Sequence, residues 1–265
     1  MDPDKAAQLY LERINIKIPV FETMKENDLN YVKMINAGQR IELNNVSFGY
    51  ISHRIVFYLM NLHIKTRQVF FARAGTSDQT DSFNADAPLG KAGIDYAKKM
   101  ADTLIAHKEE ERINLVNILK AQGEKIVDVP TKPLTIWTST RKRTVETAQY
   151  LADIGYPVRQ RSQMSQLNPG ICEKMSERRI RQDFPEEVEK HEIDPYHHRY
   201  PRAESYHDLA VRLEPVILEL EREKNDLLII AHESVLRVLY GYLMACDAMS
   251  IPTLSFPRNE IIEVS

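Results

Sequence analysis

The first sixty residues combine two amphipathic segments with short extended runs. Residues 4–13 carry apolar side chains near one side of a helix, and Asp4 is a residue type that caps helices. Extended segments are predicted at 16–21, 31–35 and 39–43, and a second helix at 49–61. This opening region contains no pattern that points to chemistry.

From residue 67 onward, short apolar runs alternate with longer amphipathic segments. Strands are predicted at 68–72, 134–137, 157–161, 227–231 and 259–264, and helices at 90–107, 204–223 and 235–246. A further helix is predicted to begin with Arg141, Lys142 and Arg143 in its first turn. The charged segment 108–122 is interpreted as a solvated helical extension. Strands that alternate with helices in this way indicate an α/β sheet with helices on both faces.

The composition excludes several classes of protein. Of the 265 residues, 43% are hydrophobic, and the formal net charge of −3 argues against a general nucleic-acid or membrane-surface binder. No apolar run is long enough to cross a bilayer, and the first residues do not resemble a signal peptide. Cys172 and Cys246 have neither metal-ligand spacing nor the pattern of a disulfide framework. We therefore expect a soluble, cytoplasmic protein that needs no metal or cofactor.

Three of the predicted strands end in residues that suit an anion. Arg73 follows the first strand, the hydroxyl of Ser139 and the basic residues 141–143 follow the second, and His232 follows the strand at 227–231. Ligands of open α/β sheets bind beyond the carboxyl ends of the strands. Guanidinium groups bind phosphate in a bidentate manner, and helix N-termini supply oriented N–H groups. Arginines are normally disfavoured in the first turn of a helix, and a bound anion would compensate for them.

Each of these residues also has a simpler interpretation. Arg73 alone would most often form a surface ion pair, and His232 alone would most often be a hydrogen-bonded core residue. The basic triplet at 141–143 would most often be a solvated helix start. Their occurrence together at three strand ends favours an anion site, and phosphate fits the inventory best.

Longer motifs give a family resemblance. Arg73-Ala74-Gly75 is similar to the Arg-His-Gly signature of the histidine phosphatase superfamily, with Ala in place of His. Arg-Tyr-Pro-Arg-Ala-Glu-Ser-Tyr at 199–206 and Ala-His-Glu-Ser-Val-Leu-Arg at 231–237 resemble the bisphosphatase half of 6-phosphofructo-2-kinase/fructose-2,6-bisphosphatase. The resemblance implies a three-layer, phosphoglycerate mutase-like sheet over 67–265. Before it, residues 1–66 resemble the C-terminal remnant of the kinase domain and its linker.

The resemblance also implies roles for individual residues. Ala74 stands where the family has its nucleophilic His, and His232 matches the second His, which stabilises the transferring phosphoryl group. Arg73 and Arg143 match the arginines that hold this phosphate. The basic residues that bind the sugar and its 6-phosphate are matched by Arg199, Arg202 and Arg237.

Several departures from the family pattern indicate a degenerate site. The Glu that serves as general acid is missing from 167–173, and Thr80 stands at the place of an Asn, although Asn84 lies nearby. Glu177 and Glu233 replace a Tyr and a Gln, which adds negative charge near a bound sugar phosphate. Loss of both nucleophile and acid predicts a silent phosphatase-like domain that still holds phosphate, as in fungal forms dominated by kinase activity.

Two alternatives stay open. In one, the domain is an active fructose-2,6-bisphosphatase in which His232 attacks phosphorus or activates water, with Glu233 or an acid from 76–86 protonating the leaving group. In the other, it is an interaction module whose surface, including the charged segment 108–112, makes contacts. The expected partners are inorganic phosphate or fructose phosphates and the protein's own kinase domain, and a homodimer is also open.

Overall fold

The computed structural model describes residues 3–36, 40–46, 49–61, 67–78, 86–123 and 129–264. The chain divides into two compact units, residues 1–62 and 63–265. The sequence predicted a domain boundary between residues 66 and 67. Residues 62–66, directly before it, lie outside the described residues. Within the described ranges, no helix is both long enough and apolar enough to cross a membrane.

The first unit contains two helices and an antiparallel pair of strands. Helix α1 covers Pro3–Lys17, strands β1 and β2 cover Tyr31–Ile35 and Arg40–Asn44, and helix α2 covers Tyr50–Asn61. These elements confirm the predictions, except that residue 39 lies outside the described residues. The extended segment predicted at 16–21 is wrong, because α1 continues to Lys17 and a 3-10 turn follows at Ile18–Val20. Pro19 in that turn has no backbone N–H, so the α-helix does not continue through it.

The second unit is built on a five-stranded sheet with the order β5-β4-β6-β3-β7. Its strands are β3 (Val69–Arg73), β4 (Leu134–Thr138), β5 (Val158–Gln160), β6 (Asp226–Ala231) and β7 (Ile261–Val264). All neighbours pair in parallel except β7, which runs antiparallel to β3 at one edge. The five strands lie where the sequence pattern predicted them, to within two residues at each end.

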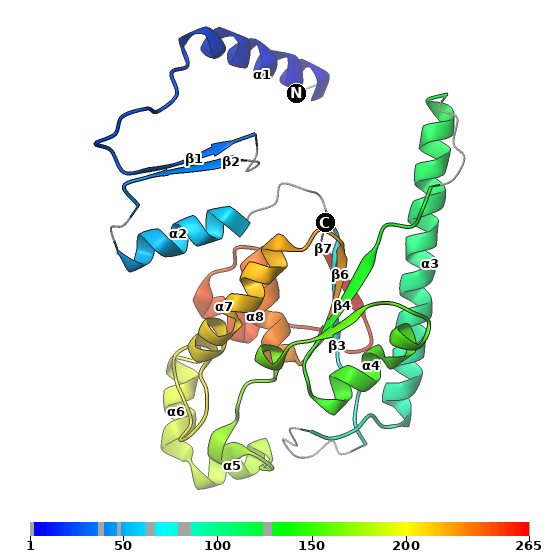
Figure 1. The fold of residues 1–265 in the computed structure, drawn as a ribbon. Coiled ribbons are helices and arrows are strands. Elements are labelled where there is room, and N and C mark those ends of the chain that lie inside the picture. Colours follow the sequence, from blue (N-terminus) through cyan, green and yellow to red (C-terminus); the bar gives the residue numbers. More distant parts are fainter. Residues whose placement is uncertain are drawn as a thin grey trace. The chain divides into compact units, whose positions relative to one another are not determined.

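Helices cover both faces of this sheet (Figure 1). Successive strand residues point to opposite sides: Phe70 joins the core under α3 (Lys91–Ala121) and α4 (Lys142–Asp153), whereas Phe71 joins the core under α7 (Tyr206–Arg222) and α8 (Glu233–Leu243). The α/β fold with helices on both faces is therefore confirmed. Two short helices that no periodic pattern predicted, α5 (Glu177–Asp183) and α6 (Pro185–Ile193), complete the unit with 3-10 turns at 162–164, 170–172 and 248–253.

The helix predicted at 90–107 and the extension predicted at 108–122 form one continuous helix, α3. The interpretation of the extension as fully solvated is wrong for Lys108, whose side chain is buried. Its Nζ atom lies 2.5 Å from Oδ2 of Asp226 and 2.8 Å from Oε2 of Glu111. Burial opposes ionisation of Asp226, but the Gln68 backbone N–H, Lys108 and Lys132 outweigh it and lower the pKa of this carboxyl.

Close packing fixes the loop after β3 against the start of α3. A Cβ atom added at Gly93 would lie 2.3 Å from the carbonyl oxygen of Thr76, and the helix backbone cannot yield at that contact as a flexible side chain would. We expect Gly93→Ala to lower the free energy of unfolding by about 1–3 kcal/mol, measured by urea denaturation. The matched control is Gly241→Ala in α8, whose added Cβ meets only side-chain carbons of Ile251 and Leu254, the nearest at 3.1 Å. Equal stabilities of the two variants would contradict this account.

Candidate functional site

A cavity of about 560 Å³ lies at the carboxyl ends of β3 and β6. Arg73 and Ala74 reach it from the end of β3, Arg143 from the first turn of α4, and His232 from the end of β6. Arg237 lines it from α8. The structure thus brings together five of the residues that the sequence singled out, from segments far apart in the chain. A volume of this size suits a small-molecule ligand.

Arg73 and Arg237 are fixed through one carboxylate, that of Glu233. The Nη2 atom of Arg73 lies 3.0 Å from Oε2 of Glu233, and Nη2 of Arg237 lies 3.0 Å from Oε1. Arg73 also donates to the Phe256 carbonyl at 2.8 Å, and Arg237 donates to the Tyr206 hydroxyl at 2.8 Å. Glu233 therefore positions two guanidinium groups and is itself neutralised by them.

Ala74 occupies the turn directly after β3. Its backbone N–H donates to the carbonyl of Ala231 at 2.9 Å, and the next N–H, of Gly75, donates to the Thr147 hydroxyl at 3.0 Å. The position is thus held rigidly beside the end of β6. Its methyl group lines the cavity but has no lone pair with which to attack phosphorus.

His232 is the N-cap residue of α8, and its Nε2 atom is buried without a hydrogen-bond partner in the structure. Burial, together with the charges of Arg143, Arg141 and Arg73, lowers the pKa of this imidazole to about 3. The ring is therefore neutral near pH 7. A bound anion would raise the pKa of this imidazole, since its negative charge would offset the neighbouring cations.

The positive charge around the cavity exceeds what its carboxylates balance. Burial lowers the pKa of Arg73 and of Arg143, and Arg258 lowers both further by like-charge repulsion. Among the described residues, the Arg143 side chain has neither an ion pair nor a hydrogen-bond partner for its buried Nε atom. Guanidinium groups held close together in this way favour the binding of a multivalent anion such as phosphate.

Three predicted ligands do not line the cavity. Ser139 is buried, its hydroxyl is hydrogen bonded to the Thr144 hydroxyl at 2.7 Å, and it accepts from the Arg141 backbone N–H. Arg199 is exposed and paired with Asp208, and Arg202 is exposed on a turn with φ +61°. Their role as ligands stays a prediction.

The structure also places the two glutamates that depart from the family pattern. Glu177 is exposed, pairs with Arg181 and does not line the cavity, whereas Glu233 lines it. The second lining carboxylate, Glu204, forms a bidentate pair with Arg212, with both N–O distances 2.8 Å. Thr80 and Asn84 lie outside the described residues. No carboxylate among the described lining residues is left without an arginine partner to act as a general acid.

Arg258 and part of the cavity wall were not predicted from the sequence. Arg258 precedes β7, and because β7 is antiparallel, its amino-terminal end lies at the same edge as the carboxyl ends of the parallel strands. Recognition of β7 as an antiparallel edge strand would have revealed it. Further lining residues come from 166–206. Cys172, Ile180 and His191 lie on short helical segments without clear periodicity, which gave no signal. His198 directly precedes the motif at 199–206 and Tyr200 lies within it, but no role was predicted for either.

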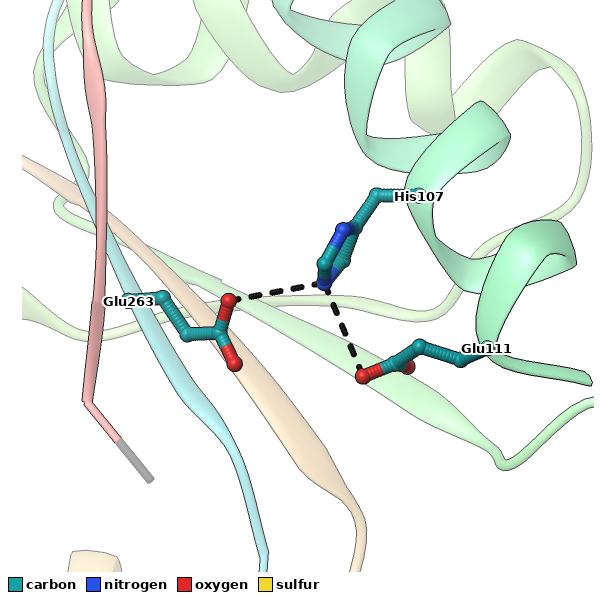
Figure 2. Close-up of side chains that lie close together, drawn as sticks. All are labelled: His107, Glu111 and Glu263. Carbon is teal, nitrogen blue, oxygen red and sulfur yellow. Dashed lines mark ion pairs between the residues drawn. The ribbon is translucent and has the colours of Figure 1, made fainter. Parts of the chain in front are cut away.

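One cluster in the described part of the chain has the side chains of a metal site. Figure 2 shows His107 and Glu111 of α3 facing Glu263 of β7, with Nε2 of His107 3.5 Å and 3.4 Å from the two carboxylates. The cluster lies beside the amino-terminal ends of β3 and β6, at the edge of the sheet opposite the cavity. Lys108 and the Gln68 amide already satisfy the carboxylates, so we assign it as an ion-pair network.

Arginines and an imidazole gather at the ends of β3 and β6, in a mostly parallel sheet with helices on both faces, and this arrangement is similar to that of the histidine phosphatase class. The chain belongs to the histidine phosphatase superfamily, because the family model for its branch 1 matches residues 119–265. The family model for 6-phosphofructo-2-kinase matches residues 1–66.

Curated relatives show which members of this superfamily the chain resembles. It is 42% identical over 272 residues to a Saccharomyces cerevisiae homologue of 6-phosphofructo-2-kinase/fructose-2,6-bisphosphatase, covering 100% of the chain and 53% of the relative. It is 33% identical over 269 residues to 6-phosphofructo-2-kinase/fructose-2,6-bisphosphatase 4 of Homo sapiens, covering 100% and 52%. To fructose-2,6-bisphosphatase of Saccharomyces cerevisiae it is 33% identical over 268 residues, covering 99% and 54%. The chain thus spans about half the length of these relatives.

Solved structures agree on the fold. A mycobacterial glucosyl-3-phosphoglycerate phosphatase superposes with a TM-score of 0.57 at 20% identity, covering 74% of this chain and 89% of that one. The alpha-ribazole phosphatase of Shigella flexneri superposes with a TM-score of 0.55 at 19% identity, covering 75% and 90%. At such identities the likeness shows the fold alone.

Proposed function

We propose that this phosphatase-like domain holds a phosphate group without hydrolysing its ester, in a protein that controls fructose 2,6-bisphosphate through a kinase domain. The observation that carries the proposal is Ala74, an inert methyl group among Arg73, Arg143 and His232 at the end of β3. A phosphoryl group placed there would be bound by cations but met by no nucleophile at that position. Both lining carboxylates, Glu204 and Glu233, are engaged by arginines.

The kinase partner is supported by three further observations. Residues 1–66 match the kinase family model, and two of the three relatives described above, at 42% and 33% identity, carry kinase names. In addition, several large apolar side chains of the first unit are exposed, among them Ile18, Val20 and Phe21. We infer that the remainder of a kinase domain packs against this unit.

The test measures binding and turnover together. Inorganic phosphate release from fructose 2,6-bisphosphate should not exceed that of His232→Ala, while inorganic phosphate should raise the Tm of the unsubstituted chain. At a phosphate concentration 100 times Kd the expected stabilisation is about 2.7 kcal/mol. Arg143→Ala should remove most of it, since that guanidinium has no competing ion pair among the described residues. Phosphate release that His232→Ala abolishes would overturn the proposal.

A second function is favoured by the state of His232. Its ring is neutral near pH 7, and its Nε2 atom has no hydrogen-bond partner in the structure. A neutral imidazole keeps one nitrogen lone pair, which is what a nucleophile needs. An active phosphatase using His232 would accumulate a phosphohistidine at this residue during incubation with fructose 2,6-bisphosphate. Mass spectrometry of the acid-labile adduct distinguishes this function from silent binding.

A further inference from the structure

The cavity has two chemically different walls. The sheet wall consists of Arg73, Arg143, His232, Arg237 and Arg258, and it carries the cationic groups. The cap wall consists of Cys172, Ile180, His191, His198 and Tyr200, which come from the segment containing α5 and α6. No lysine or arginine is present among the described residues of the cap wall. Charge for binding phosphate is therefore confined to the sheet wall.

The cap wall is neutral or compensated. Burial, and the neighbouring His198, lower the pKa of His191, so its ring is uncharged near pH 7. The Nε2 atom of His198 lies 3.0 Å from a carboxylate oxygen of Glu187, which would compensate any charge on that ring. Burial raises the pKa of the Cys172 thiol and of Tyr200. A second phosphate dianion placed against this wall would be desolvated without a counter-ion, which is unfavourable.

Of the three arginines that the resemblance implied for the 6-phosphate, Arg237 belongs to the sheet wall and shares the Glu233 carboxylate with Arg73. The other two, Arg199 and Arg202, are directed elsewhere. Arg199 contacts both carboxylate oxygens of Asp208, at 2.7 and 2.8 Å. The same carboxylate accepts from the Ser205 backbone N–H in the capping box of α7. Turning Arg199 into the cavity would therefore break an ion pair tied to a helix cap. Arg202 is exposed and does not line the cavity.

The cap wall has instead the chemistry to bind the uncharged, polar part of a phosphate ester. The Nδ1 atoms of His191 and His198 are buried without hydrogen-bond partners in the structure. Their rings and that of Tyr200 form one cluster, with centroid separations of 5.1–5.6 Å. Such nitrogens are satisfied by ligand hydroxyl groups, and the ring faces and Ile180 pack against a carbon skeleton.

We propose that this cavity selects phosphate monoesters with a single phosphate and an uncharged, hydroxyl-bearing body, and gains nothing from a second phosphate. The inference rests on the proposed function, because the one phosphate is held by the sheet wall. It departs from the substrate named for the relatives, fructose 2,6-bisphosphate. The body of the ester lies against the cap wall.

Calorimetric titration of the whole chain with three ligands tests this selectivity. Fructose 6-phosphate should bind about 3- to 10-fold more tightly than inorganic phosphate, the effect of about one added hydrogen bond. Fructose 2,6-bisphosphate should bind no more tightly than fructose 6-phosphate. His191→Phe keeps a ring but removes the nitrogens, so it should bring fructose 6-phosphate down to the affinity of inorganic phosphate and leave inorganic phosphate unchanged.

The matched control is Arg199→Gln combined with Arg202→Ala, which should alter none of the three affinities. Bisphosphate binding at least tenfold tighter than the monoester, with the margin lost in this double variant, would overturn the inference and leave the proposed function intact. Equal affinities for inorganic phosphate and fructose 6-phosphate, unchanged by His191→Phe, would overturn it as well. Failure of inorganic phosphate itself to bind would remove the proposed function and this inference together.

Discussion

Replacing Lys108 by methionine is expected to lower the free energy of unfolding by about 3 kcal/mol, at the lower end of the 3–5 kcal/mol typical for breaking a buried ion pair. Lys108 is 3% exposed and Asp226 is 0% exposed, so removal of the ammonium leaves a buried carboxylate short of one partner. Lys132 and the Gln68 backbone N–H still contact Asp226 and limit the loss. Urea denaturation of the whole chain measures the change.

The matched control is Lys132→Met, because Lys132 contacts the same carboxylate at 2.7 Å but its side chain is 46% exposed. We expect it to cost less than about 1 kcal/mol, as surface pairs do. The difference in free energy of unfolding between the parent chain and Lys108→Met should have its full value above the unfolded pKa of an aspartate, about 3.9. It should disappear as the pH falls through the lowered pKa of Asp226, since protonation removes the ion pair. If Lys108→Met lowered the free energy of unfolding by no more than Lys132→Met, the assignment of Lys108 and Asp226 as a stabilising buried ion pair would be contradicted.

Lys108 also shows where prediction from sequence ends. Charged residues at 108–112 are typical of a solvated helix, and nothing local separates Lys108 from its neighbours. Its burial depends on Asp226, which is 118 residues away and begins a strand of the sheet. Strands and their ends were predictable because apolar runs are local patterns. Partners across the fold were not.

The same distinction explains which site residues sequence reasoning found. Arg73, Arg143 and His232 follow predicted strands, and the ends of parallel strands meet at one edge by topology. Arg199 and Arg202 belong to a motif that implied a ligand site, but the orientation of Arg199 is set by its pairing with Asp208. Position in a motif could not reveal that contact.

Introducing a nucleophile with Ala74→His is expected to give a single burst of nitrophenolate from para-nitrophenyl phosphate. Ala74 lies in the cavity beside Arg73, Arg143 and His232, so an imidazole there would face a bound phosphoryl group. Its lone pair would form the N–P bond as the O–P bond of the ester breaks. The electron pair leaves on the phenolate oxygen, which is stable as an anion and needs no general acid. Stopped-flow absorbance measures one nitrophenolate per chain.

A sugar phosphate should give no such burst with the same variant, because its alkoxide leaving group requires a proton donor. General acid catalysis contributes typically about 10²- to 10⁴-fold, and both lining carboxylates are held by arginines. Pro169 lines the cavity and has a backbone conformation open to other residues, φ −78° and ψ −6°. Adding Pro169→Glu to Ala74→His should therefore raise fructose 2,6-bisphosphate hydrolysis by a factor in that range.

The position of the new imidazole, rather than its presence, is what the burst depends on. Ala203→His places the same ring on another lining residue, away from the end of β3, and should give no burst. A burst from both variants would mean that any imidazole in the cavity suffices. No burst from Ala74→His, in a chain that still binds inorganic phosphate, would mean that the phosphoryl group lies elsewhere in the cavity. With a burst from Ala74→His alone, the silent site differs from a working one by a nucleophile at residue 74 and an acid near residue 169.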